Sequence, residues 1–278
     1  MRQYHNLLKN VYQNGAQKTD PQGIGNKALF GQMLRYEPAE AFPLITEREI
    51  SLEKAAGELL WMLSGDTTLE GLHRFGIRWW DSYDTPEVRK IYHLKEGHLG
   101  PIYGSQIRHF NGGGKKPVDQ LSIVIDSLKK SPDSRRHLIT LWNPLEADQV
   151  YYAPCITQLK FDHAQGKLSL EVHQRSADVA GGLPFDIAEY ALFLLMTAQV
   201  TNLEPNELIY FLSDTHIYKD QMDHVKILLA RKPKPFPKVK LNPKMKKMSD
   251  FLEALPKDFI TITGYNPHPL LRIPVSAQ

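Results

Sequence analysis

The only cysteine of the chain, Cys155, stands in the segment Ala153-Pro154-Cys155-Ile156, at the beginning of a strand-like stretch. Pro154 has a fixed φ and no backbone donor, so it holds the following residue rigidly. A lone cysteine is usually a small buried apolar residue, but as a thiolate it is a strong nucleophile. Cys155 is therefore the first candidate for nucleophilic catalysis, and it has no partner for a disulfide within the chain.

A second group of reactive side chains lies in Gln174-Arg175-Ser176-Ala177-Asp178. Residues 157–162 and 168–173 both alternate apolar and polar side chains, and Ala164-Gln165-Gly166-Lys167 separates them, which predicts a hairpin. In that hairpin Arg175 lies near Cys155 across the ladder. A guanidinium beside a thiol lowers the pKa of the thiol, which favours the nucleophilic form.

The pair Arg135-Arg136 follows Ser131-Pro132-Asp133-Ser134 and could cradle a phosphate together with Arg175 and Ser176. For any one of these arginines alone, a surface ion pair is the simpler interpretation. The glycine-rich stretches at 23–25 and 112–114 match no Walker or dinucleotide motif and predict turns. The histidines lack metal-ligand spacing, so we expect no metal site.

Helices and strands alternate along the chain without a repeat or a long linker. Apolar periodicity predicts helices over 4–12, from Ser51 to Gly65, over 118–128 after Pro117, and over 185–200. Strands are predicted at 137–142, in the hairpin and at 259–263. This order predicts a single α+β domain over residues 1–278, built around one sheet.

Composition limits the class of protein. The chain has 278 residues, 42% of them hydrophobic and 23% charged, and a formal net charge of +3. This excludes collagen and disordered chains. We see no apolar run of about 20 residues that would span a bilayer, and no export leader at the N-terminus. With one cysteine, these features lead us to expect a cytoplasmic protein without a membrane partner.

A basic strip, residues 231–247, carries eight Lys and Arg residues and no acid; without it, the net charge of +3 becomes −5. Four prolines break the strip, so it predicts an extended surface segment rather than a basic helix. Phe236 is its only aromatic residue and offers little for bases to stack on. We therefore favour a solvated surface over nucleic-acid binding.

Eight short blocks resemble thymidylate synthase and its relatives that hydroxymethylate pyrimidine nucleotides. They are Glu58-Leu59-Leu60-Trp61, Trp80-Asp81, Gly100-Pro101-Ile102-Tyr103-Gly104, Asp133-Ser134-Arg135-Arg136, Pro154-Cys155, Gln174-Arg175-Ser176, Gly182-Leu183-Pro184-Phe185 and Asp214-Thr215-His216-Ile217-Tyr218. The resemblance covers residues 1–278. It implies a mixed sheet flanked by helices, a homodimer with this sheet at the interface, and 5,10-methylenetetrahydrofolate as co-substrate.

The resemblance also implies roles for these residues. Cys155 would add to C6 of the pyrimidine and make C5 a carbon nucleophile, while Glu58 and Tyr103 would organise water and proton transfers around C5. The residues that would hold the nucleotide are Gln174, Arg175, Ser176, His216 and Tyr218, with Arg135 and Arg136 reaching in from the partner subunit. Those on the folate side would be Trp80, Asp81 and Asp178.

The most informative departure from the family pattern is Asp186, where thymidylate synthases carry Asn. An amide matches the N3–H donor and O4 acceptor of uracil, whereas cytosine presents an N3 acceptor and an amino donor. A carboxyl group accepts from that amino group and, when protonated, donates to N3. Asp186 therefore predicts a cytidylate substrate, although it is also compatible with a helix-capping role.

Other departures limit the resemblance. Pro21 replaces an arginine of the phosphate loop, Ile156 replaces His, Ala177 replaces a common Cys, and Glu189 replaces Ser. Glu189 is one helical turn from Asp186 and could tune its protonation. The tail after Ile273 keeps Pro-Val and then differs; in the family this tail closes the site against water.

The sequence thus predicts a cytidylate (CMP or dCMP) 5-hydroxymethyltransferase. Thymidylate synthase (dUMP to dTMP) and a cytidylate 5-methyltransferase remain alternatives, and Trp80 keeps methyl transfer open. A non-catalytic nucleotide- or RNA-binding protein that uses the basic strip is the alternative from another class.

Overall fold

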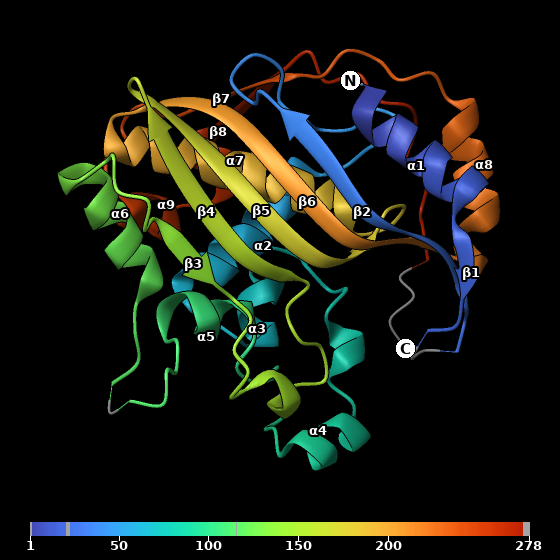
Figure 1. The fold of residues 1–278 in the computed structure, drawn as a ribbon, viewed down its shortest axis with the longest axis horizontal. Helices are drawn as coiled ribbons and strands as arrows, with labels where there is room; N and C mark the ends of the chain where they lie inside the picture. Colours follow the sequence, from blue (N-terminus) through green and yellow to red (C-terminus); the bar gives the residue numbers. More distant parts are fainter. Residues whose placement is uncertain (1, 21–22, 115, 275–278) are drawn as a thin grey trace.

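A six-stranded mixed sheet forms the centre of the computed structural model, which describes residues 2–20, 23–114 and 116–274 (Figure 1). The strand order is β1-β2-β6-β5-β4-β3. Only β5 and β6 pair in parallel; the other neighbours are antiparallel. The strands are β1 (Ala16–Lys18), β2 (Asn26–Tyr36), β3 (Leu138–Thr140), β4 (Ile156–Ala164), β5 (Lys167–Asp178) and β6 (Glu204–Tyr218).

The predicted hairpin is confirmed as β4 and β5. Its two-residue turn places Gln165 at φ 52° and Gly166 at φ 80°, which matches the twist of the strands that it joins. At the open end of the hairpin, the backbone N–H of Arg175 donates to the carbonyl oxygen of Cys155 at 2.8 Å. The pairing therefore brings these two residues together as the sequence predicted.

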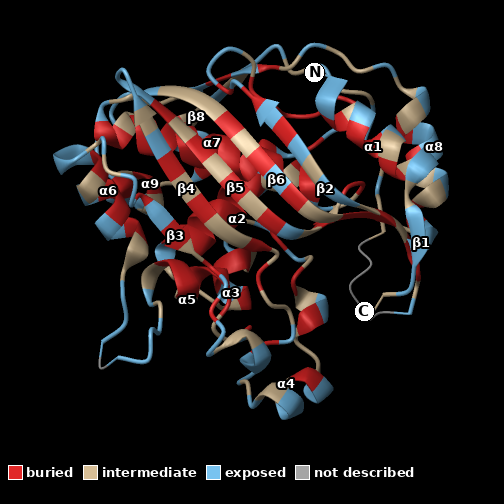
Figure 2. Cartoon of the chain, viewed as in Figure 1, coloured by how far each residue is buried: buried red, intermediate tan, exposed pale blue. Residues whose placement is uncertain are grey.

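The parallel pair β5 and β6 needs a crossover, and α7 (Leu183–Thr201) supplies it. This helix lies behind the sheet in Figure 1 and packs against β5, β6 and α2 (Leu52–Ser64). By length and composition alone α7 could cross a membrane, which differs from the expectation that the chain has no such apolar run, but most of the helix is buried inside the protein (Figure 2). The predicted apolar helix is thus confirmed as a core helix.

The ends of α2 follow the signals in the sequence. Ser51 caps its first turn by accepting from the N–H of Lys54, and Gly65 ends it in the left-handed conformation at φ 87°. The N-terminal helix α1 (Arg2–Asn14) is also confirmed and ends at Gly15.

The helix expected after Pro117 begins later than predicted. Asp119 caps α6 (Gln120–Lys130) by accepting from the N–H of Ser122, whereas Val118 exchanges two backbone hydrogen bonds with Phe110. The remaining α-helices are α3 (Leu69–His73), α4 (Pro86–Tyr92), α5 (Tyr103–Arg108), α8 (Met222–Ala230), α9 (Met248–Glu253) and α10 (Pro256–Phe259). Within the described residues, short 3-10 turns form at η1 (Asp81–Tyr83), η2 (Ala147–Gln149) and η3 (Lys219–Gln221).

Part of the basic strip forms a small second sheet. β7 (Lys238–Leu241) pairs with β8 (Ile260–Thr263), the predicted late strand. Lys238 and Lys240 are exposed while Val239 is buried, so the lysines alternate outward. The strip is therefore an extended surface segment, as the sequence predicted, with one strand inside it.

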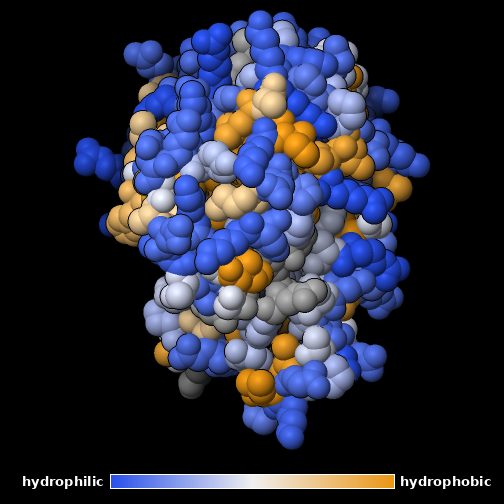
Figure 3. All heavy atoms as spheres, turned by 90° about the vertical axis from the view of Figure 1, so that its right-hand side faces the viewer, coloured by the Kyte–Doolittle hydropathy of each residue, from blue (hydrophilic) through white to orange (hydrophobic). Residues whose placement is uncertain are grey.

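The apolar side chains that remain on the surface are unevenly placed. The face turned to the viewer in Figure 3 is mainly hydrophilic, with hydrophobic side chains in separate small groups. By contrast, Met33 on β2 is 54% exposed, and Phe211, opposite it on β6, is 37% exposed. The outer surface of the sheet thus carries large apolar side chains without a cover in the single chain.

Gly104 in α5 allows a close backbone contact beside Tyr103. A Cβ at this position would lie 2.3 Å from the backbone oxygen of Asp66, which cannot rotate away. We expect Gly104→Ala to lower the free energy of unfolding by about 1–3 kcal/mol. Gly112→Ala is the matched control, because a Cβ there meets nothing within 4 Å; it should change stability by less than about 0.5 kcal/mol. Urea denaturation measures both, and equal midpoints would contradict the steric argument.

Candidate active site

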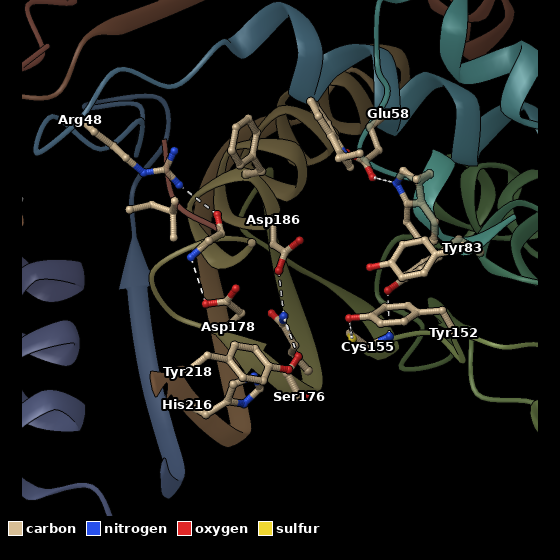
Figure 4. Close-up of a pocket in the computed structure, with 18 residues that line it drawn as sticks. Arg48, Glu58, Tyr83, Tyr152, Cys155, Ser176, Asp178, Asp186, His216 and Tyr218 are labelled. Atoms are coloured by element: carbon tan, nitrogen blue, oxygen red, sulfur yellow. Dashed lines mark hydrogen bonds between the residues drawn. The ribbon is translucent and has the colours of Figure 1, made fainter. Parts of the chain in front are cut away.

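A cavity of about 220 Å³ opens where the last residues of β5 and β6 meet the first turn of α7 (Figure 4). Its wall brings together residues from α2, α5, α7, both strands and the loops at 79–83 and 152–155. A wider cleft of about 1000 Å³ adjoins it and shares Cys155, Ser176 and His216. The structure therefore gathers most of the predicted site residues into one connected space.

Strand alternation selects which residues of β5 face the cavity. Gln174, Ser176 and Asp178 line it, as the two-residue period of a strand requires. Arg175 lies in the wall of the wider cleft instead. Ala177 is fully buried and does not line the cavity. A small side chain at this position therefore does not enlarge the cavity.

Cys155 lies in the cavity wall between two tyrosines. Its backbone N–H donates to the Tyr103 hydroxyl at 2.8 Å, and its Sγ donates to the Tyr152 hydroxyl at 3.5 Å. Burial raises the pKa of the Cys155 thiol, while Tyr152 and then Arg175 act in the opposite direction. The sequence argument that Arg175 lowers this pKa thus has the right sign, but in the free protein burial has the larger effect.

Arg175 fixes the loop that carries the thiol. Its Nε donates to the carbonyl oxygen of Pro154 at 3.0 Å and its Nη2 to that of Ala153 at 2.7 Å. Its guanidinium also lies 5.2 Å from the centre of the Trp142 ring. Arg175 is therefore both a cation in the wider cleft and a support for the position of Cys155.

Asp186, in the first turn of α7, faces the cavity (Figure 4). Its Oδ2 accepts from Nε2 of Gln174 at 2.8 Å. Burial raises the pKa of Asp186 to about 7, Gln174 opposes the shift, and the nearby Glu58 adds to it. Asp186 thus exchanges its proton near neutral pH, which an ordinary exposed aspartate does not do.

Glu58 enters the cavity from α2 between two indole donors. The Nε1 atom of Trp79 donates to its Oε2 at 3.1 Å, and Nε1 of Trp80 donates to its Oε1. Burial raises the pKa of Glu58, and these bonds act against the shift. Glu189 is 3% exposed and forms a hydrogen bond with Glu58, so the predicted second carboxyl does lie beside this group.

His216 and Tyr218 line the opposite side of the cavity, at the end of β6 (Figure 4). Nδ1 of His216 lies 2.9 Å from Oδ1 of Asp214, and Nζ of Lys18 lies 2.7 Å from Oδ2 of the same carboxylate. The bond with His216 is the main reason that the pKa of Asp214 falls to about 2. Asp214 is therefore ionised and orients the imidazole.

The three residues expected on the folate side are not equivalent. Trp80 and Asp178 line the cavity. Asp178 accepts from the backbone N–H groups of Ala180 and Gly181 and from the side chain of Gln221. Asp81 is not among the lining residues; its carboxylate lies 2.7 Å from Nε2 of His73.

Arg135 and Arg136 lie in the loop before β3, exposed to solvent, and neither lines the cavity or the wider cleft. Within a single chain they do not meet Arg175 and Ser176. That Arg135 and Arg136 reach into the site of a partner subunit therefore stays a prediction. Pro21, where the phosphate-loop arginine was expected, lies outside the described residues.

The sequence predicted no site role for several residues that line the cavity: Arg48, Trp79, Tyr83, Tyr152 and Phe185. Trp79 and Phe185 directly adjoin predicted site residues, and Tyr152 precedes Cys155 by three, so proximity was an available signal. Arg48 had no such signal. It reaches the site from a loop near the N-terminus and donates to the carbonyl oxygens of Ala180 and Gly181.

A comparison with protein-family models agrees with this geometry. The model described as thymidylate synthase matches residues 2–277, nearly the whole chain. Members of this family carry out folate-dependent one-carbon transfer to a pyrimidine nucleotide. The predicted α+β fold with a mixed sheet flanked by helices is also confirmed. The chain belongs to the thymidylate synthase family.

Proposed function

We propose that this protein transfers a one-carbon unit from 5,10-methylenetetrahydrofolate to C5 of a cytidine 5′-monophosphate, CMP or dCMP, and gives the 5-hydroxymethyl nucleotide. The observation that carries the proposal is Asp186, a cavity carboxyl whose pKa is raised to about 7. The family relationship supplies the reaction type, and this carboxyl supplies the choice of base.

Asp186 can pair with both polar groups on the N3–C4 edge of cytosine. A protonated Asp186 donates to N3 of cytosine and accepts from the 4-amino group, so both polar edges are paired. Against uracil, the ionised carboxylate faces the O4 acceptor, and an unpaired buried polar group discriminates strongly. Gln174 orients the carboxyl by donating to Oδ2. A proton shared with N3 would also offset charge that develops on the ring during attack.

Cys155 is the proposed nucleophile. Its Sγ forms a bond to C6 of the pyrimidine, and the electron pair of the C5–C6 double bond becomes available at C5. The two tyrosine hydroxyls and Arg175 position the thiol and favour the thiolate. Glu58, held by two indoles, faces the same space and would handle proton transfer around C5.

The aromatic residues of the cavity wall fit a folate. Trp79, Trp80 and Phe185 offer flat apolar surfaces, and a Cβ at Gly182 would meet nothing within 4 Å, so the wall is open there. Asp178 would contact the pterin, although two backbone N–H groups already occupy one of its oxygens. When bound, methylenetetrahydrofolate supplies the one-carbon unit.

The ends of β5 and β6 carry the residues proposed to contact the phosphate and the sugar of the nucleotide. Arg175 and Ser176 would bind the 5′-phosphate in the wider cleft, and His216 and Tyr218 would bind the 3′-hydroxyl. We propose that Arg135 and Arg136 complete the phosphate site of a partner subunit in a homodimer. The exposed Met33 and Phe211 on the outer sheet surface support that interface.

The product is hydroxymethyl or methyl according to whether water reaches the one-carbon unit at C5. Asp186, a carboxyl beyond the family pattern that lines the cavity, makes the site more polar and favours addition of water. Ile273 lines the cavity, and the tail from residue 275 onward lies outside the described residues. The test below also separates the alternatives, which are thymidylate synthase, cytidylate 5-methyltransferase, and nucleotide or RNA binding without catalysis.

The test is tritium release from CMP, dCMP and dUMP labelled at C5, with methylenetetrahydrofolate, and with product masses recorded. We expect release from a cytidylate at least about 100-fold faster than from dUMP, and a product that carries a hydroxymethyl group. Faster turnover of dUMP would refute the assignment of Asp186. A methylated product with dihydrofolate would refute hydroxymethylation, and no release from any nucleotide would favour a binding protein.

Cys155→Ser should abolish tritium release, because the hydroxyl group is a far weaker nucleophile than the thiolate at neutral pH. Nucleotide binding should change little, since the phosphate and sugar contacts remain. Equilibrium binding of the cytidylate separates the two effects. Undiminished release in this variant would reject the covalent mechanism.

Asp186→Asn should lower kcat/KM for the cytidylate by about 100-fold or more and raise it for dUMP. In the unaltered protein, kcat/KM for the cytidylate should fall as pH rises through about 7, because the carboxyl then loses the proton that it donates to N3. This alkaline limb should be absent with dUMP in the Asn variant. A cytidylate profile that stays unchanged by the substitution would contradict the role of Asp186.

The same raised pKa predicts an effect on stability. The folded protein binds this proton with a pKa of about 7 against 3.8 in an unfolded chain, so the contribution of Asp186 becomes less favourable as pH rises through that interval. Asp186→Asn should therefore raise the urea midpoint more at pH 8 than at pH 5. The opposite trend would show that the carboxyl is not desolvated in the folded protein.

A further inference from the structure

Glu189 is a buried carboxyl that no step described above uses. It lies on α7, three residues after Asp186, and it is 3% exposed. It does not line the cavity, yet it forms a hydrogen bond with Glu58, which does. Glu189 therefore contacts Glu58, the proposed proton-transfer group, without lining the cavity itself.

Two carboxylates cannot share a hydrogen bond unless one of them carries a proton. The oxygens of Glu58 already accept from the indoles of Trp79 and Trp80, so this group is the better stabilised anion of the pair. The titratable groups that face Glu189 are Glu58 on α2, Asp186 and Tyr190 on α7, and Tyr210 on β6. The two carboxyl groups disfavour a second negative charge at Glu189, whereas burial keeps both tyrosines neutral.

We propose that Glu189 is a positioning residue whose buried carboxyl carries a proton and donates a hydrogen bond to Glu58, which keeps the Glu58 carboxylate ionised and directed at C5. The proposal rests on the proposed function, because it assigns Glu58 to proton transfer at that carbon. Burial and the charges of Glu58 and Asp186 raise the pKa of Glu189 well above the ordinary range, in agreement with this placement of the proton.

The consequence is kinetic. Glu189 does not line the substrate space, so its loss should affect the chemical step and leave nucleotide binding largely unchanged. Removing its O–H takes one of three donors from the Glu58 carboxylate. The pKa of Glu58 then rises, and a smaller fraction of the protein holds the ionised base at a given pH.

Three variants test this positioning role. Glu189→Gln keeps a neutral donor of the same size, and Glu189→Leu removes the donor at similar volume. Glu53→Gln is the matched control, because Glu53 is an exposed carboxyl on α2. Tritium release from the cytidylate gives kcat and KM across a range of pH, and urea denaturation confirms that each variant folds.

We expect Glu189→Leu to lower kcat about tenfold near neutral pH, with KM little changed, and to move the acidic limb of the kcat profile to higher pH. Glu189→Gln should restore kcat to within about threefold of the unaltered protein, because the donor is retained. Equal losses in both variants, or a kcat profile in Glu189→Leu with an unmoved acidic limb, would overturn the proposal.

An infrared measurement on the ligand-free protein locates the proton without any substrate. The C=O stretch of a protonated carboxylic acid absorbs at a different infrared frequency from the stretches of a carboxylate. We expect the band of the protonated acid to persist above pH 7. It should be lost in Glu189→Gln but not in Glu53→Gln. An unchanged band in Glu189→Gln would overturn the inference while leaving the proposed function standing. Loss of the band as expected, in a protein that releases no tritium, would refute the proposed function instead.

Discussion

The parallel pairing of β5 with β6 is the constraint on which the rest of the structure depends. Two parallel neighbours must be joined by a crossover, and α7 is that crossover. Its first turn therefore stands beside the last residues of β5, and Asp186 faces Gln174 as a consequence. The register then aligns Ser176 with Asp214 and Asp178 with His216, so the adjoining ends of β5 and β6 carry the groups for which we propose contacts with phosphate, sugar and folate.

The cavity combines this geometry with an electrostatic cost. Burial places Glu58, Asp186 and Glu189 in one acidic cluster, which disfavours ionisation of all three at once. Indole and amide donors offset part of the cost at Glu58 and Asp186. Carboxyls that keep their protons near neutral pH are useful at an active site, because they donate hydrogen bonds that an ordinary carboxylate cannot. Asp186 and Glu189 fit this description, with different partners.

Local patterns predicted the hairpin, the buried helix and the caps of α2, because each depends on residues close in sequence. The strands β2 and β6 were not predicted, although β6 lies at the centre of the sheet. In β6, Ile209 and Phe211 are apolar on the outer surface while Leu208, Tyr210 and Leu212 are buried. Apolar residues on both surfaces hide the alternation that marks a half-buried strand. The same outer surface supports the proposed subunit interface.

The sequence by itself determined the reactive residue types, their order along the chain and the family to which they point. It also singled out Asp186 and Glu189, since a carboxyl in place of a neutral side chain is visible without a structure. Only the tertiary structure decided that Arg135 and Arg136 lie outside the cavity of their own chain, that Tyr152 and Arg48 belong to it, and that burial outweighs Arg175 at Cys155. The physical reason is that desolvation and hydrogen bonding depend on neighbours far apart in sequence, and only the packed chain brings those neighbours together.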